Sequence, residues 1–249
     1  MDMLSSEFCK LRRTHVPTVA IVIPLVSVVF GAGNYAANSD TLDAGWTSYW
    51  SQTTLFYGLL FMVAGISILA SAAWRVEHRG GNWNTLLTSS RSAASLVTAK
   101  LGVVVALTTL MQCIFIVTSM VGGWVSGLSG TPPLELLASA LLAVVPAVAV
   151  AAWQSFASMV IRNFAMPVAI GVLLSIAGFG TIAAGATAAQ FLLPPVGVSA
   201  TLWMGGTAVA GSGALELGAI CRIIASTLLL AAAAWLASVV YLRRVDVKA

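Results

Sequence analysis

The fold of this chain is decided by the stretch from Trp74 to Lys100, which reads Trp-Arg-Val-Glu-His-Arg-Gly-Gly-Asn-Trp-Asn-Thr-Leu-Leu, then Thr-Ser-Ser-Arg, and continues to Lys100. It is the only long polar interval on the basic side of an otherwise apolar chain. Trp83, Leu86 and Leu87 are spaced by three and four residues, so they share one face of a short amphipathic helix. Such a helix has no aqueous core of its own. It either lies on the lipid surface or presents its apolar face to a soluble partner.

The composition places the chain in a membrane. Its 249 residues are 59% hydrophobic and only 8% charged. Soluble domains carry about 25% charged residues, so this composition indicates an integral membrane protein. Cys9, Cys113 and Cys221 lie far apart and form no Cys-x-x-Cys pair, so we expect neither a disulfide framework nor a metal site.

Six apolar runs are long enough to cross a bilayer, because about 20 helical residues at about 1.5 Å each span a hydrocarbon core of about 30 Å. The expected spans are about 17–37, 53–74, 101–122, 134–161, 165–187 and 223–242. The sequence therefore predicts an all-α integral membrane protein with one transmembrane domain over residues 1–249. Pro146 should kink the fourth helix, because proline removes one backbone donor.

The first sixteen residues predict a short amphipathic helix before the first span. Leu4, Phe8 and Leu11 form its apolar stripe, at helical spacing. Its polar residues are Glu7, Lys10, Arg12 and Arg13. Basic residues beside an apolar stripe favour a position in the headgroup plane. A signal peptide is the alternative interpretation, and the length of the following apolar run argues against it.

The interval between the last two spans, about 188–222, is apolar and glycine-rich although it lies outside the predicted helices. Non-helical backbone at membrane depth is tolerated only where protein covers it. We therefore expect this segment to be partly re-entrant or to cap the bundle.

Basic residues set the orientation. Of the twelve Lys and Arg residues, only Arg222 falls on one side of the predicted spans. That side also holds the acidic residues Asp40, Asp43, Glu135 and Glu216. The other side holds Lys10, Arg12, Arg13, Arg75, Arg79, Arg91, Lys100, Arg162, Arg243, Arg244 and Lys248. The positive-inside rule then places both termini in the cytoplasm of a multi-pass protein, as an even number of spans requires.

No Asp, Glu, Lys, Arg or His falls in the interior of any of the six predicted runs, and Glu135 lies at the very start of the fourth. Carriers coupled to protons or sodium normally place titratable groups there, so energy for active transport would have to come from elsewhere. The polar residues are milder: Asn34, Gln112 and Gln154. Interhelical hydrogen bonding is the favoured role for these three, and contact with a substrate is the alternative.

The sequence also lacks the parts of an enzyme. It has no GxxxxGK[ST] phosphate loop and no Ser/His/Asp set on one side of the membrane. His15 and His78 have no second ligand at metal spacing. We therefore expect no catalysis, no metal and no cofactor in this chain, and no nucleic-acid partner. Glu77 has two interpretations: a plain ion pair with Arg75, Arg79 or Arg91, or a functional contact that orients the loop helix.

Two motifs carry a family resemblance. Ser5-Ser-Glu7-Phe-Cys-Lys10-Leu-Arg-Arg13-Thr14, before a proline-bearing first span, resembles the start of ABC-2-type permeases. Glu77-His-Arg-Gly80-Gly-Asn-Trp83-Asn-Thr-Leu86-Leu87, followed by Arg91, looks like their cytoplasmic loop between spans two and three. The closest subgroup serves lantibiotic immunity and bacitracin export. The motifs cover about 40 residues, and the topology covers the whole chain.

The resemblance implies roles for these segments. The loop would be a coupling helix seated on an ABC ATPase, with Glu77, Arg79, Trp83, Leu86, Leu87 and Arg91 as coupling residues. The N-terminal helix, with Phe8, Lys10, Leu11, Arg12 and Arg13, would be an interfacial elbow. Asn34, Gln112 and Gln154 are the candidates for a substrate path.

By the same resemblance, the chain would be the permease of an ATP-driven exporter in a bacterial cell membrane. Its partners would be ATPase subunits carrying ATP and Mg, a second permease copy or paralogue, and lipid. Its substrates would be amphiphilic peptide antibiotics or lipid-embedded compounds, which links it to antibiotic resistance. The alternative function is a non-transporting membrane scaffold or sensor partner. An uncoupled channel is less favoured, because no ring of pore charges or carbonyl filter is evident.

Overall fold

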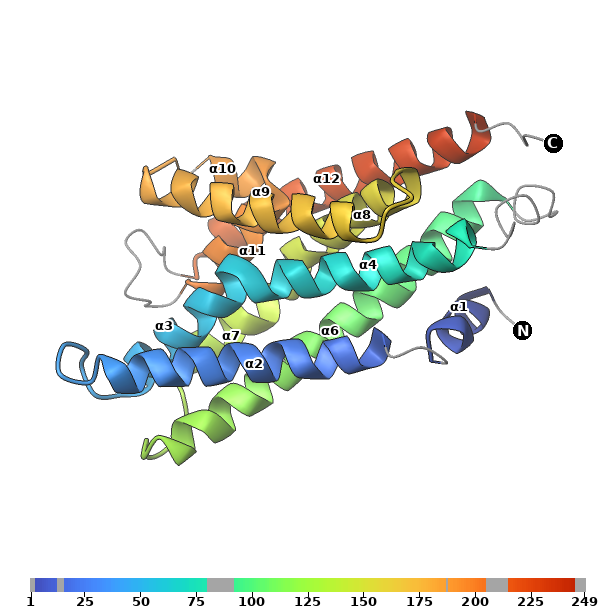
Figure 1. Ribbon diagram of the computed structural model, residues 1–249. Helices are drawn as coiled ribbons and strands as arrows, with labels where there is room; N and C mark the ends of the chain where they lie inside the picture. Colours follow the sequence, from blue (N-terminus) through green and yellow to red (C-terminus); the bar gives the residue numbers. More distant parts are fainter. Residues whose placement is uncertain (1–2, 13–15, 80–91, 187, 205–214, 245–249) are drawn as a thin grey trace.

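The computed structural model describes residues 3–12, 16–79, 92–186, 188–204 and 215–244. Within these residues the chain is helical apart from turns and short connections. The helices are α1 (Met3–Arg12), α2 (Val16–Ala37), α3 (Trp46–Phe56), η1 (Tyr57–Phe61), α4 (Met62–His78), α6 (Ala93–Val125), α7 (Leu134–Leu142), α8 (Val144–Val160), α9 (Ala165–Ala183), α10 (Ala189–Leu192), α11 (Pro194–Leu202) and α12 (Leu217–Arg244). They form one elongated bundle (Figure 1).

Six helical stretches are long and apolar enough to cross a membrane, which confirms the predicted all-α membrane fold. Three of them begin at least six residues earlier than predicted. The second starts at Trp46 rather than Thr53, the third at Ala93 rather than Leu101, and the sixth at Leu217 rather than Ile223. These extensions are less apolar than the runs that they precede, so hydropathy alone did not include them.

The second and fourth spans form the centre of the bundle. Their most apolar windows are 61% and 56% buried, against 22–28% for α2, α9 and α12. The peripheral helices therefore present most of their apolar surface outward. Figure 1 shows α4 and α8 running between the outer helices.

The fourth span is broken near Pro146, as the sequence predicts. Helix α7 ends at Leu142 and α8 begins at Val144, with Ala143 between them. Proline has no N–H to donate to the carbonyl four residues earlier, and its ring crowds that carbonyl. The missing bond falls at Leu142, where the helix is interrupted.

A π-helical turn interrupts the second span over Tyr57–Phe61. Its wider turn changes the backbone pairing, and nearby carbonyls accept side-chain hydrogen bonds from other helices. Ser199 Oγ donates to Gly58 O at 2.8 Å, and Ser175 Oγ donates to Leu59 O at 2.6 Å. The π-turn therefore joins the second span to α9 and α11.

Helix α11 lies in the interval that the sequence predicts to be partly re-entrant. It packs against α8, α9 and α7, and Val196, Val198 and Leu202 are buried. Trp203 Nε1, just after α11, donates to Thr54 O at 3.2 Å. This stretch thus contributes to the bundle interior, and its depth in a bilayer stays a prediction.

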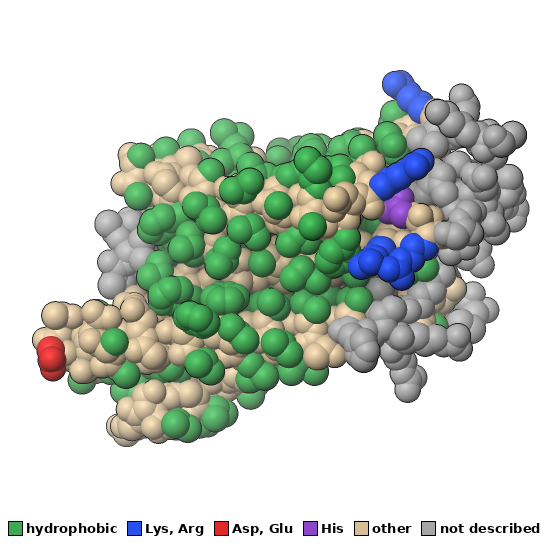
Figure 2. All heavy atoms as spheres, viewed as in Figure 1, with side chains coloured by type: hydrophobic (Ala, Val, Ile, Leu, Met, Phe, Trp, Pro, Cys, Tyr) green, Lys and Arg blue, Asp and Glu red, His purple; other side chains and the backbone are tan. Residues whose placement is uncertain are grey.

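Most of the described Lys and Arg residues lie at one end of the bundle, together with Glu7 and Glu77, and the other described acidic residues lie at the opposite end with Arg222. Figure 2 shows Lys and Arg side chains at the end where α1 and the last turn of α12 lie, and an acidic side chain at the opposite end. The sequence predicts this separation from the order of the spans. The bundle alone does not fix which end faces the cytoplasm.

We predict that Gly31→Ala in α2 destabilises the protein. A Cβ at this position would lie 2.4 Å from the Cα of Thr53, so α2 and α3 would have to move apart. Overpacking of this kind costs about 1–3 kcal/mol. Gly33→Ala is the matched control, because a Cβ there meets nothing within 4 Å.

Thermal unfolding of the purified protein in detergent measures the difference. Gly33→Ala should melt at or slightly above the wild-type temperature, because alanine has the higher helix propensity. Equal melting temperatures for the two variants would contradict the close packing of α2 on α3.

Candidate functional site

A buried lysine lies at the basic end of the bundle. Lys100 belongs to α6, which begins at Ala93 after the cap residue Ser92, whose Oγ accepts from Ser95 N at 3.2 Å. The sequence interpretation placed Lys100 in the polar interval between two spans, whereas the structure places it inside α6. Because the helix starts earlier, the side chain of Lys100 is carried into the bundle and is fully buried.

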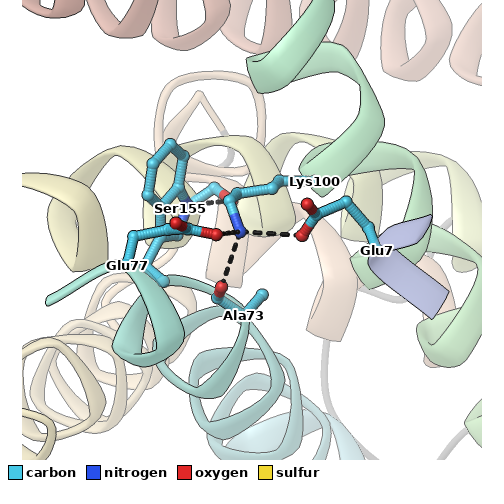
Figure 3. A network of polar contacts seen from close by, with 6 residues as sticks. Glu7, Ala73, Glu77, Lys100 and Ser155 are labelled. Carbon is cyan, nitrogen blue, oxygen red and sulfur yellow. Dashed lines mark hydrogen bonds and ion pairs between the residues drawn. The ribbon is translucent and has the colours of Figure 1, made fainter. Parts of the chain in front are cut away.

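The ammonium group of Lys100 donates three hydrogen bonds. Its Nζ lies 2.8 Å from Glu7 Oε2, 2.9 Å from Glu77 Oε1 and 2.9 Å from Ala73 O. Figure 3 shows the three acceptors converging on the nitrogen. An ammonium group has three protons, so these contacts satisfy it completely. The Trp74 ring centroid, 5.2 Å from Nζ, adds a cation–π contact.

The three charged groups come from three helices. Glu7 lies on α1, Glu77 lies on the last turn of α4, and Lys100 lies on α6. Each of these residues is at least 97% buried, since their exposed fractions are 3%, 3% and 1%. We call this group the Lys100 cluster. It fixes α1 against the two helices that flank residues 80–91.

Hydrogen bonds next to the Lys100 cluster hold α4 against α8. Trp74 Nε1 donates to Ser155 Oγ at 3.1 Å, and Ser71 Oγ lies 3.1 Å from Ser158 Oγ. One turn further on, His78 Nε2 lies 2.9 Å from Ser158 O. The end of α4 is therefore held by α1, α6 and α8 together.

The predicted coupling residues fall mostly outside the described part of the chain. Trp83, Leu86, Leu87 and Arg91 lie in residues 80–91. Arg79 is exposed just after α4, whereas Glu77 is buried and pairs with Lys100, a partner that the sequence interpretation did not name. The coupling role of this set stays a prediction.

The predicted elbow residues lie on or just after α1. Phe8 is 37% exposed. Lys10, Leu11 and Arg12 belong to the helix, although their side chains lie outside the described part, as does Arg13 entirely. The sequence interpretation listed Glu7 among the polar residues of this helix and did not predict that it is buried. An acid among the basic residues of an amphipathic segment was the only signal.

The three candidates for a substrate path do not form one site. Asn34 Nδ2 donates to Gln52 Oε1, and Gln112 Nε2 donates to Ala140 O at 2.7 Å. Gln154 lies on α8, and its Oε1 is buried without a hydrogen-bond partner among the described residues. The first two residues thus join helices. A substrate contact of these residues stays a prediction.

The sequence analysis did not identify Trp50 and Tyr57, whose polar atoms lie in the same part of the bundle as Gln112. Trp50 Nε1, Tyr57 Oη and Gln112 Oε1 are buried and have no hydrogen-bond partner among the described residues. Tyr57 stacks on Phe115 with ring centroids 3.9 Å apart, and Trp50 meets the same ring edge-on at 6.4 Å. No sequence signal relates Trp50 and Tyr57 to Gln112, because the group is assembled from α3, η1 and α6.

Six helices long and apolar enough to cross a bilayer, with the Lys100 cluster at one end, define a multi-pass membrane protein. Its described residues contain no recognisable catalytic set. The chain matches the model of the ABC-2 family transporter proteins over residues 3–178. It belongs to this family, whose members are membrane components of transporters. No curated protein and no solved structure matches the chain.

We predict that Lys100→Met strongly destabilises the protein, because it leaves two buried carboxylates without their shared cation. Removing one partner of a buried ion pair costs about 3–5 kcal/mol. Arg79→Gln is the control, since Arg79 is an exposed cation on the same side of the bundle. Thermal melts in detergent should show a large loss for Lys100→Met and little change for Arg79→Gln. Equal stability of the two variants would show that the cluster does not hold the helices together.

Proposed function

We propose that this chain is the permease subunit of a bacterial ABC exporter that is driven by a separate ATPase subunit. Membership of the ABC-2 family supports the transporter class. The observation that carries the coupling role is the Lys100 cluster, because it joins α1 to both helices that flank residues 80–91. Family resemblance assigns the ATPase contact to these residues.

The Lys100 cluster provides a physical route from the loop to the bundle. Separating a nearly dry ion pair takes each buried charge away from its counter-ion, and this costs several kcal/mol. A push on residues 80–91 would therefore move α4, α6 and α1 as one unit. Such a unit can pass a movement of the ATPase to the spans instead of absorbing it in a loop.

Transport would follow alternating access. ATP closes the ATPase dimer, the coupling helices move with it, and the interface between two permease copies opens outward. ATP and Mg bind to the ATPase, so this chain supplies the path and no catalysis. The basic end of the bundle, with both termini, faces the cytoplasm in this arrangement, because basic residues are retained there.

The substrate class is amphiphilic peptide antibiotics of the lantibiotic or bacitracin kind, or other lipid-embedded compounds. Family resemblance supports this substrate class. The buried atoms Trp50 Nε1, Tyr57 Oη and Gln112 Oε1 are a candidate binding site for the substrate. Unpaired polar atoms inside a bundle are costly, and a polar group of a substrate could pair with them when the helices part. Aromatic rings around Phe115 would contact its apolar part.

We predict that Trp83→Ser together with Leu87→Ser releases the ATPase while the permease stays folded in the membrane. Both side chains lie on the proposed apolar ridge, and burying a Leu contributes about 1.5–3 kcal/mol. Large aromatic residues contribute disproportionately to interfaces. Co-purification of the ATPase with the variant in detergent measures the loss.

Asn82→Ser together with Asn84→Ser is the matched control in the same loop, because it changes no apolar side chain. It should retain the ATPase at wild-type stoichiometry. If the Trp83 and Leu87 variant also retains it, the ridge rests on lipid rather than on the ATPase. If even the wild-type chain brings down no ATPase, the scaffold or sensor function takes the place of transport.

We also predict that transport does not require a proton gradient. The described Asp, Glu, Lys, Arg and His residues of the bundle lie near the ends of its spans, and no series of them crosses it. Efflux from vesicles with ATP should continue after an uncoupler collapses the gradient. Efflux that stops while ATP hydrolysis continues would contradict the ATP-driven mechanism.

A further inference from the structure

A shallow cleft opens at the basic end of the bundle, on the side of α4 away from Lys100's carboxylates. It lies between the end of α4, the end of α8 and the start of α9. Its lining includes Ser71, Arg75, His78, Ser158, Arg162 and Phe164. The cleft is too shallow for a drug-sized ligand, so a bound group would have to be small and held at its mouth by the side chains that line it.

The cleft carries positive charge that the described residues do not balance. Arg75 and Arg162 are both exposed, and neither has a carboxylate partner in the part of the chain that the structure describes. The described carboxylates at this end are Glu7 and Glu77, and both bind Lys100. Figure 2 shows basic side chains on both sides of a histidine here.

Neighbouring groups restrain two of the polar side chains that line the cleft, Arg75 and Asn163. The Arg75 guanidinium carbon lies 5.2 Å from the centroid of the Phe164 ring, which restrains the side chain without neutralising it. Asn163 Oδ1 accepts from Ala165 N at 2.8 Å at the start of α9. Arginine donates in a planar fork that matches two oxygens of one phosphate, so two arginines around a small cleft favour that group.

The surroundings of the cleft indicate which kind of molecule would carry a phosphate bound there. Beyond the cleft, α9 exposes Met166 and Leu173, which are 56% and 65% exposed. They are seven residues apart in sequence and therefore lie on one face of the helix. This apolar face runs along a span that is only 22% buried over its most apolar window. A cationic cleft at the head of an apolar helix face is the arrangement that suits a phospholipid.

We propose that the cleft binds the phosphate of an anionic phospholipid in the leaflet at the basic end of the bundle. Arg75 and Arg162 contact the phosphate oxygens, and an acyl chain lies along the exposed face of α9. Basic pockets between spans bind anionic headgroups in this way. Since α4 also carries Glu77, the bound lipid holds α4, α8 and α9 together beside the Lys100 cluster.

The test measures the melting temperature of the purified full chain in detergent with added lipid. Phosphatidylglycerol should raise the wild-type melting temperature by about 2–4 °C or more, and phosphatidylcholine should raise it less. Arg75→Gln together with Arg162→Gln should abolish the difference between the two lipids. Arg243→Gln together with Arg244→Gln, which removes a basic pair of α12 at the same end, should preserve it.

Three outcomes would overturn the proposal. They are an unchanged lipid effect in the Arg75 and Arg162 variant, an equal loss in the Arg243 and Arg244 control, and an equal rise with inorganic phosphate. If the glutamine variant does not fold, Arg75→Lys with Arg162→Lys keeps the charge and removes the planar fork. Native mass spectrometry should then count fewer bound phosphatidylglycerol molecules than on the wild type, and an equal count would overturn the proposal.

Discussion

The ammonium group of Lys100 is buried among Glu7, Glu77 and a carbonyl of α4, and the basic end of the bundle depends on it. A charge in a dry interior is tolerated only when every proton and lone pair finds a partner. This requirement fixes α1 against α4 and α6, although α1 is too short and too polar to be a span. The same contacts make the ends of α4 and α6 one unit, and the proposed coupling depends on that unit.

The centre of the bundle is held by different means. The π-turn at Tyr57–Phe61 and the break at Ala143 both alter backbone pairing within a span, and side chains of neighbouring helices satisfy nearby carbonyls. Small residues such as Gly31 let helices approach closely. A bundle built this way has polar contacts at defined places. Trp50 Nε1, Tyr57 Oη and Gln112 Oε1, near Phe115, differ because they have no hydrogen-bond partner among the described residues.

Much of the fold could be predicted from the sequence. Six apolar runs specify six helices, because a backbone in lipid must pair its polar groups internally. The order of Lys, Arg, Asp and Glu along these runs specifies which charges share an end. Pro146 specifies a break, since a missing N–H is a local property of the chain. Each of these depends on composition or on neighbours in sequence, and the structure agrees with them.

The candidate site was decided only by tertiary structure. Glu7 and Lys100 are 93 positions apart, and neither apolar periodicity nor motif spacing relates them. The start of α6 at Ala93 depends on the cap at Ser92 and on packing, so a hydropathy boundary placed Lys100 outside the helix. The insertion of α11 against α8 and the cleft between α4, α8 and α9 likewise depend on how helices meet. Sequence by itself determined which segments are long and apolar enough to cross a membrane, because that is a property of each segment, whereas contacts between segments required the assembled bundle.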